Sequence, residues 1–247
     1  MKRVSSGIKG LDKLIQGGFP EKSSIVLCGG PGTGKSIFGL QFLWEGVQKG
    51  ENGLYVSIEE KPQNLLQQAV QFGWNFAKYK NRVSFLKVPI DEANVDIMSL
   101  IEKEAKRIKA QRVVLDSLSI LAINGPMYRL PIKVKTKARF ARTEIQPSAL
   151  NQGEETQQFI YIFVARMSDL GATTLFIADS PQAENYLTRD TVSEFACDGL
   201  IQVKLMEMGK TVNRTVEIKK MRKTKIVPGL QLLDFSKDGL VIKPFEY

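Results

Sequence analysis

The feature that most constrains the fold of this 247-residue chain is a glycine-rich segment at residues 29–36. It reads Gly-Gly-Pro-Gly-Thr-Gly-Lys-Ser and fits the pattern G-x-x-x-x-G-K-[ST]. The apolar residues 25–28 before it predict a buried strand, and the apolar residues spread over 37–47 predict a mostly buried helix. A glycine loop between a strand and a helix is the context in which main-chain N–H groups surround a phosphate. The sequence therefore predicts a phosphate-binding loop.

Each residue type in this loop has an expected task. Glycine lets the backbone adopt positive φ and approach a phosphate closely, and the positive end of the following helix strengthens the field of the N–H groups. Lys35 can reach the β- and γ-phosphates as a positive charge, and the Ser36 hydroxyl can ligate Mg²⁺. The residues expected to bind the nucleotide are Gly30, Pro31, Gly32, Thr33, Gly34, Lys35, Ser36 and Ile37.

Composition narrows the possible functions. The chain has 35 Lys and Arg residues against 26 Asp and Glu residues, and the formal net charge of +9 favours anionic partners. It has no His, which excludes a His-based triad, a His zinc site and imidazole acid–base catalysis, and its two Cys residues cannot form a disulfide framework. No apolar run approaches the roughly 20 residues that span a bilayer, and no signal-peptide pattern follows Met1. We therefore expect a cytoplasmic protein that does not enter a membrane.

Strands and helices are predicted to alternate along most of the chain. This order is typical of an α/β fold in which a mainly parallel sheet is flanked by crossover helices. After residue 199, short apolar runs joined by turns predict an antiparallel extension at one edge of the sheet. We expect residues 1–247 to form a single domain. The predicted strands are 54–58, 83–88, 112–116 and 173–178, with 200–205, 214–218, 230–235 and 240–242 in the extension; the predicted helices begin at 11, 37, 62, 97 and 159.

Three acidic residues follow predicted strands, where ligands bind in open α/β sheets. Asp116 ends strand 112–116, and its carboxylate can hold Mg²⁺ through water, opposite Ser36. Glu59 and Glu60 follow strand 54–58, and one of them could orient the attacking water and accept its proton. The alternative for this pair is a solvated cap on the helix that starts at Pro62.

Taken together, these motifs resemble the KaiC-like branch of the RecA/RadA ATPases over nearly the full length of the chain. The resemblance implies a RecA-like core, ATP or ADP with Mg²⁺ as ligands, and a hexameric ring with ATP between neighbouring subunits. It also implies that Glu59 and Glu60 are catalytic. The further motifs that carry it are Gly7-Ile8-Lys9-Gly10-Leu11-Asp12, Gly17-Gly18, Phe72-Gly73-Trp74, Leu115-Asp116-Ser117, Thr173-Thr174, Glu194-Phe195 with Asp198-Gly199, and Arg214 through Arg222.

Lys220 and Arg222 match a Lys-x-Arg segment that, in this family, reaches into the nucleotide site of the neighbouring subunit. Such a segment delivers positive charge to the γ-phosphate only after assembly. The alternative is a basic edge strand that suppresses aggregation. The chain departs from the family pattern at two places. A Gly and a His usual just after the Lys-x-Arg are replaced, with Lys223 following Arg222, and Ala178-Asp179-Ser180 stands where clock-type members have Thr-Glu. The chain has one core domain, so no circadian role is inferred.

Residues 124–156 interrupt the α/β pattern. They contain three Pro residues, and six basic residues without an acidic one lie between positions 125 and 143. A long excursion of this kind is usually functional or disordered. In the RecA fold this loop faces the channel of the ring, so we consider nucleic acid, a protein partner or intersubunit contacts, and a solvated loop.

Three functional hypotheses follow. The first is a slow ATP-hydrolysing ring with a regulatory output that another protein reads. The second is a recombinase-like DNA-dependent ATPase that holds single-stranded DNA through residues 124–156. The third is a nucleotide-binding switch that hydrolyses too slowly to turn over.

Overall fold

A computed structural model describes residues 1–89, 95–124, 152–181, 186–208 and 211–245. A nine-stranded mixed sheet in the order β11-β10-β9-β8-β3-β7-β6-β4-β5 forms its centre. The strands β3, β4, β5, β6 and β7 are all parallel, and β8 also runs parallel to β3. The bounds are β3 Ser24–Gly29, β4 Gly53–Ser57, β5 Val83–Lys87, β6 Arg112–Asp116, β7 Thr173–Asp179 and β8 Gly199–Met208.

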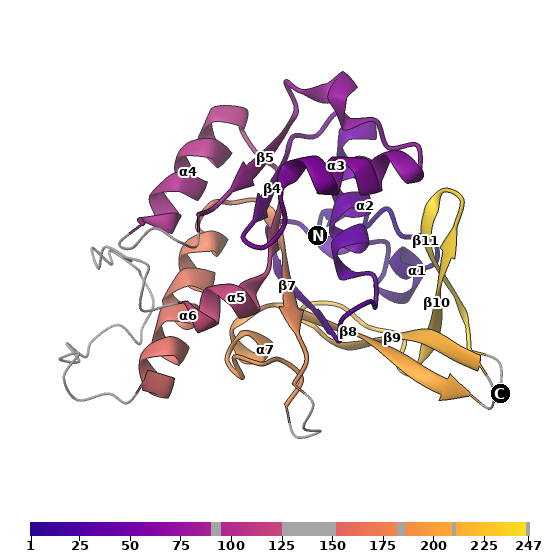
Figure 1. The fold of residues 1–247 in the computed structure, drawn as a ribbon. Coiled ribbons are helices and arrows are strands. Elements are labelled where there is room, and N and C mark those ends of the chain that lie inside the picture. The colour runs from indigo at the N-terminus through magenta and orange to yellow at the C-terminus, as the bar shows by residue number, and fades with distance from the viewer. Residues whose placement is uncertain (90–94, 125–151, 182–185, 209–210, 246–247) are drawn as a thin grey trace.

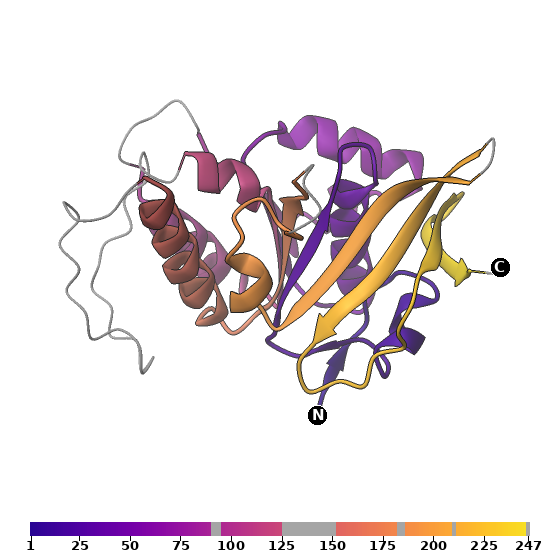
Figure 2. The ribbon, with the colours of Figure 1, turned by 90° about the horizontal axis from the view of Figure 1, so that it is seen from below.

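The C-terminal part of the chain extends the sheet beyond β8. Strands β9 (Thr211–Met221), β10 (Gln231–Ser236) and β11 (Gly239–Pro244) each pair antiparallel with the strand before them. Figure 2 shows β8 and β9 as long adjacent ribbons beside β3. The predicted antiparallel extension is therefore confirmed: β8 to β11 form an antiparallel meander, which joins the core through the parallel pairing of β8 with β3.

Helices cover both faces of the sheet because the parallel strands are apolar on both sides. On β3, Ile25 and Leu27 face one core and Val26 and Cys28 face the other. Figure 1 shows α2 and α3 on one side of the strands and α4, α5 and α6 on the other. The helices are α1 Leu11–Leu14, α2 Lys35–Gln48, α3 Pro62–Gln71, α4 Ile97–Ile108, α5 Leu118–Ile123, α6 Gln152–Ser168 and α7 Ser193–Ala196, with a 3₁₀ turn at Phe76–Tyr79.

The first residues form a small substructure of their own. Strands β1 (Arg3–Val4) and β2 (Phe19–Pro20) pair antiparallel apart from the main sheet and enclose α1. The burial of Ile8, Leu11 and Ile15 in the core that contains α2 anchors this substructure.

Most of the predicted excursion at 124–156 lies outside the described residues. Within the described part, α5 carries the chain to Asn124, and α6 already begins at Gln152. The interruption is therefore shorter at its C-terminal end than predicted, and α5 was missed.

The strand directions divide candidate site residues between two edges of the sheet. The carboxyl ends of β3, β4, β6 and β7 meet at one edge, which carries the glycine loop. Strand β9 runs the other way: its last residue, Met221, pairs with Gly199, which in turn pairs with Ile25 near the start of β3. Lys220 and Arg222 therefore lie at the edge opposite the glycine loop of their own chain.

Candidate nucleotide-binding site

The glycine loop joins β3 to α2 as predicted. Gly32 has φ 72° and Gly34 has φ 97°, a left-handed conformation that other residues rarely adopt. The Thr33 hydroxyl donates to the Gly30 carbonyl at 2.8 Å and closes the loop on itself. The α2 helix then begins at Lys35, so its positive end faces the loop.

The Lys35 ammonium lies inside the loop. Its Nζ donates to the carbonyls of Gly29 and Gly30, both at 2.8 Å, and lies 3.2 Å from Oδ1 of Asp179 at the end of β7. The Lys35 side chain is 11% exposed, whereas that of Asp179 is 39% exposed. The loop therefore already holds a positive charge at its centre, with one carboxylate beside it.

Ser36 and Asp116 are in direct contact. The Ser36 hydroxyl donates to Oδ2 of Asp116 at 2.7 Å, and the Tyr55 hydroxyl donates to the same oxygen at 2.6 Å. Burial raises the pKa of Asp116, although these two hydrogen bonds act in the opposite direction. Burial, together with the Asp116 charge, raises the pKa of Tyr55 well above its ordinary value, so its hydroxyl remains a donor.

Tyr55 was not among the predicted site residues. Its hydroxyl was the available signal, because a buried Tyr usually finds a hydrogen-bond partner. The sequence did not show that this partner would be Asp116, since the contact depends on β4 and β6 being neighbours in the sheet.

The carboxylates of the two adjacent glutamates have different hydrogen-bond partners. Oε1 of Glu59 accepts a 2.7 Å hydrogen bond from the hydroxyl of Ser117, the residue after Asp116. Oε1 of Glu60 accepts one of the same length from Gln68 on α3. The N-cap residue of α3, Lys61, makes no side-chain cap hydrogen bond, and Glu60 contacts this helix through Gln68.

An aromatic ring and a guanidinium adjoin the loop from the C-terminal extension. Arg214 Nε donates to the Gly32 carbonyl at 3.3 Å, and its guanidinium carbon lies 4.9 Å from the ring centroid of Phe235. A Cβ atom built on Gly34 would lie 3.1 Å from Phe235, so the ring is in close contact with the loop. No local sequence pattern indicates this contact, because Arg214 is 182 residues from Gly32.

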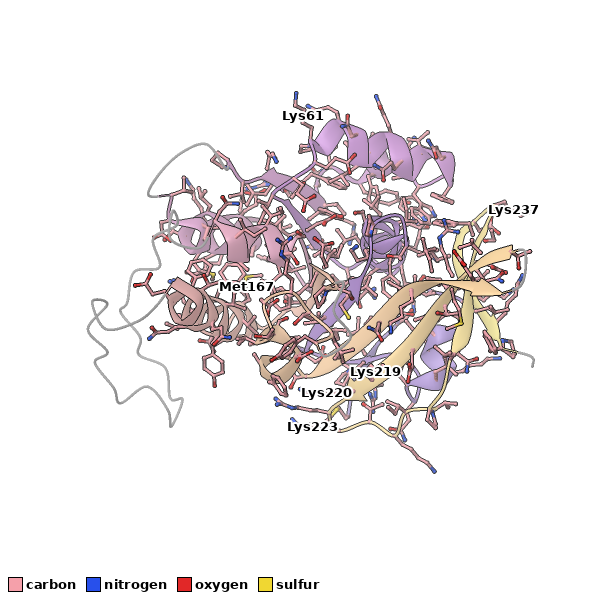
Figure 3. All side chains as sticks on the ribbon, turned by 60° about the horizontal axis from the view of Figure 1, so that its bottom comes forward. Lys61, Met167, Lys219, Lys220, Lys223 and Lys237 are labelled. Carbon is pink, nitrogen blue, oxygen red and sulfur yellow. The ribbon has the colours of Figure 1, made fainter. Side chains whose placement is uncertain are left out.

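Lys220 and Arg222 instead contact α7. Lys220 Nζ donates to the carbonyls of Glu194 and Phe195 at 3.0 and 3.2 Å, and Arg222 Nη2 donates to the Phe195 carbonyl at 3.1 Å. Burial lowers the pKa of Lys220, and the nearby Arg222 charge adds to this effect. In Figure 3, Lys220 lies with Lys219 and Lys223, far from Lys237 in the turn between β10 and β11.

The donors at the loop fit a magnesium ion that is shared with phosphate. Ser36 and Asp116 offer neighbouring oxygens, and Mg²⁺ is usually bound by one or two protein oxygens together with phosphates and water. Among the described residues, no group of three or more His, Cys, Asp or Glu side chains could hold a metal ion without such help.

These features define a RecA-like α/β fold with a phosphate-binding loop at the carboxyl edge of its parallel strands. The model of the KaiC ATPase family matches residues 4–130 and 143–247. The chain belongs to the KaiC ATPase family, as its motifs indicated, and this membership supports nucleotide binding.

Known relatives agree with this assignment. The chain is 33% identical to a UPF0273 protein of Pyrococcus furiosus, covering 99% of this chain and 95% of the relative. It is 31% identical to a UPF0273 protein of Pyrococcus horikoshii over 98% and 94% of the two chains. The crystal structure of a KaiC-like protein from Pyrococcus horikoshii superposes with a TM-score of 0.79 at 29% identity, covering 98% and 99%. In the parts of this chain that the structure describes, no helix is long and apolar enough to cross a membrane.

Proposed function

We propose that the chain binds ATP at the glycine loop and hydrolyses it slowly, as a ring whose conformation another protein reads. The observation that carries this proposal is the contact between Ser36 and Asp116 beside the loop that holds Lys35. It places an acidic oxygen next to the hydroxyl at the end of the phosphate-binding loop, so that one cation could be bound by both.

In this mechanism the loop N–H groups and Lys35 bind the phosphates, and Ser36 and Asp116 would hold Mg²⁺. The metal, when bound, would neutralise negative charge that develops on the phosphate oxygens. Tyr55 fixes the orientation of the Asp116 carboxylate.

Glu59 is proposed as the group that accepts the proton of the attacking water. Its carboxylate is solvent-exposed and is oriented by Ser117, immediately after the Asp116 ligand. Glu60 is proposed to hold the backbone next to Glu59 in place and not to act as the base. Its carboxylate accepts a hydrogen bond from Gln68, and its main chain is hydrogen-bonded to the Ser57 hydroxyl.

We further propose that Lys220 and Arg222 complete the nucleotide site of a neighbouring protomer. They lie at the sheet edge opposite their own loop, so within one chain they cannot reach the phosphates that this loop would bind. A ring in which each protomer presents this edge to the loop edge of the next brings the two together.

Mixing variants tests this arrangement. Arg222→Ala should lower the ATP hydrolysis rate about tenfold, because one charge-assisted contact is lost while Lys220 remains. Equal amounts of Arg222→Ala and Lys35→Ala protomers, dissociated and reassembled together, should recover about a quarter of the normal rate, since half the loops are intact and half of these meet an intact Arg222. Each variant reassembled alone is the control. Mixed assemblies, verified by mass, that remain as inactive as the average of the two controls would refute a role in trans.

Asp179 is expected to weaken ATP binding. Its carboxylate lies 3.2 Å from the Lys35 ammonium and therefore close to the predicted position of the phosphates. Asp179→Asn should tighten ATP binding about fivefold at low salt, because one repulsive charge is removed, and the gain should shrink as salt is added. Titration calorimetry at two salt concentrations measures both effects. Weaker binding by the variant would show instead that Asp179 helps to hold the ligand.

The DNA-dependent alternative depends on residues 124–156, of which the structure describes only Asn124 and the first turn of α6. The proposed function predicts an ATP hydrolysis rate that single-stranded DNA does not change at low salt. Stimulation of hydrolysis together with a shift in a DNA-binding assay would favour the recombinase-like reading. Tight ATP binding without measurable turnover would favour the non-enzymatic switch.

A further inference from the structure

The chain that follows Arg222 is held by residues from the N-terminal substructure. Arg3 Nη1 donates to the Thr224 hydroxyl at 2.6 Å, and Arg3 Nη2 donates to the Lys223 carbonyl at 3.2 Å. These contacts join residues more than 200 positions apart. Figure 2 shows the end of β9 close to the N-terminus. We call this set of contacts the Arg3 clamp.

Two further contacts stiffen the clamp. The Gln16 side-chain oxygen accepts from Arg3 Nη2 at 3.3 Å and from the Lys225 main-chain N–H at 3.0 Å. The same Arg3 guanidinium donates to the Gly18 carbonyl at 3.3 Å. The Arg3 guanidinium is therefore hydrogen-bonded both to the N-terminal substructure and to the segment after β9. Because this group is planar and rigid, it fixes how the two segments are oriented relative to each other.

The clamp acts on a reversal of the backbone directly after Arg222. Lys223 has φ 57°, in the left-handed region that favours Gly. The Thr224 hydroxyl, which accepts from Arg3, in turn donates to the Arg222 carbonyl at 3.2 Å. The orientation of the Arg222 main chain is thus linked to Arg3 through one intermediate hydroxyl.

The side chain of Arg222 is held less firmly than its main chain, whose N–H donates to the Asp198 carbonyl at 2.8 Å. Its side chain is 52% exposed, its ion pair with Asp198 measures 3.6 Å, and its hydrogen bond is to the carbonyl of Phe195, a residue that is itself 70% exposed. Solvent-exposed ion pairs of this kind restrict a side chain only weakly. The backbone contacts on the C-terminal side therefore add to this main-chain hydrogen bond in setting where Arg222 points, next to Lys220, which is held in β9 by its pairing with Leu200.

We propose that Arg3 is a positioning residue for the pair formed by Lys220 and Arg222, which it orients through Lys223 and Thr224. This inference rests on the proposed action of that pair on a neighbouring protomer. It assigns a role in hydrolysis to an N-terminal residue at the edge opposite its own glycine loop.

Arg3→Met tests the proposal, because it keeps the aliphatic stem and removes every donor. We expect the maximal hydrolysis rate to fall about fivefold, as for the loss of one charge-assisted hydrogen bond, with the KM for ATP and the affinity of the protomer for ATP unchanged. Arg3→Lys, which keeps the charge and one donor, should lose less. Lys2→Met, which removes an exposed ion pair with Glu21 from the preceding residue, is the matched control and should retain the full rate.

A purely structural role is separated from positioning by combining variants. Arg3→Met in an Arg222→Ala background should cause little further loss, because the group that Arg3 positions is already absent. Arg3→Met protomers reassembled with Lys35→Ala protomers should regain activity, as Arg222→Ala protomers should. Additive losses, or a failure to regain activity in mixtures that Arg222→Ala does rescue, would overturn the proposal.

The outcomes for the two proposals are distinguishable. If Arg222→Ala itself leaves hydrolysis unchanged, the action in trans fails, and the role of Arg3 fails with it. If Arg222→Ala lowers the rate and Arg3→Met does not, only the Arg3 clamp is refuted. A fall in the melting temperature of Arg3→Met with weaker ATP binding would also refute it, because positioning alone changes neither.

Discussion

Replacing Glu59 by Gln is expected to lower the rate of ATP hydrolysis at least about 100-fold, the usual contribution of a positioned general base. Gln has the same shape and can still bond to Ser117, but it cannot accept a proton from water. ATP affinity should stay the same, because the Glu59 carboxylate contacts Ser117 and not the glycine loop. Single-turnover hydrolysis and equilibrium binding measure the two quantities separately.

Glu60→Gln is the matched comparison. The Glu60 carboxylate is bonded to Gln68 on α3, so we expect its loss to reduce hydrolysis by less than about tenfold through a shift of the Glu59 backbone. The double variant should resemble Glu59→Gln alone. A larger effect at Glu60 would reverse the two roles, and a normal rate in the double variant would show that neither residue is the base.

Lys35→Ala is expected to weaken ATP binding by about 100-fold or more, because the phosphates lose a charge-assisted contact in a largely buried site. The removal also takes one of the donors from each of the Gly29 and Gly30 carbonyls and leaves the Asp179 carboxylate without its ion-pair partner. Calorimetric titration with ATP and Mg²⁺ measures the change.

Lys49→Ala is the control for this variant. Lys49 lies at the other end of α2 and forms an exposed ion pair with Glu45, so its loss should leave ATP affinity unchanged. Circular dichroism and a melting curve establish that both variants are folded. Tight ATP binding by folded Lys35→Ala would contradict the assignment of the loop.

The parallel core could be predicted from the sequence because its strands are short apolar runs separated by amphipathic helices. Helix α5 was missed because residues 118–123 are almost uniformly apolar, and such a run shows no helical period. The sequence analysis did not place β8 beside β3, because the connection from β7 has only a four-residue helix, α7, and none of the longer helices that usually mark a parallel crossover.

The candidate site could be predicted only where a local pattern encodes it. The glycine loop and the acids after β4 and β6 are such patterns, and the structure places them at one edge of the sheet. Sheet pairing brings Tyr55 to the site, and the C-terminal extension brings Phe235 to it. No local sequence pattern therefore indicates either residue. The separation of Glu59 from Glu60 depends on Ser117 and Gln68, which lie on different elements.

The antiparallel course of β9 has a consequence for assembly. A protomer that offers its basic pair at one rim and its glycine loop at the opposite rim is a head-to-tail unit, and a pair of such units still has one unmatched head and one unmatched tail. Only closure of the circle, or indefinite growth, satisfies every unit. Under the proposed mechanism dilution would therefore act as an off-switch, since a solitary chain carries both halves of a catalytic centre but cannot bring them together.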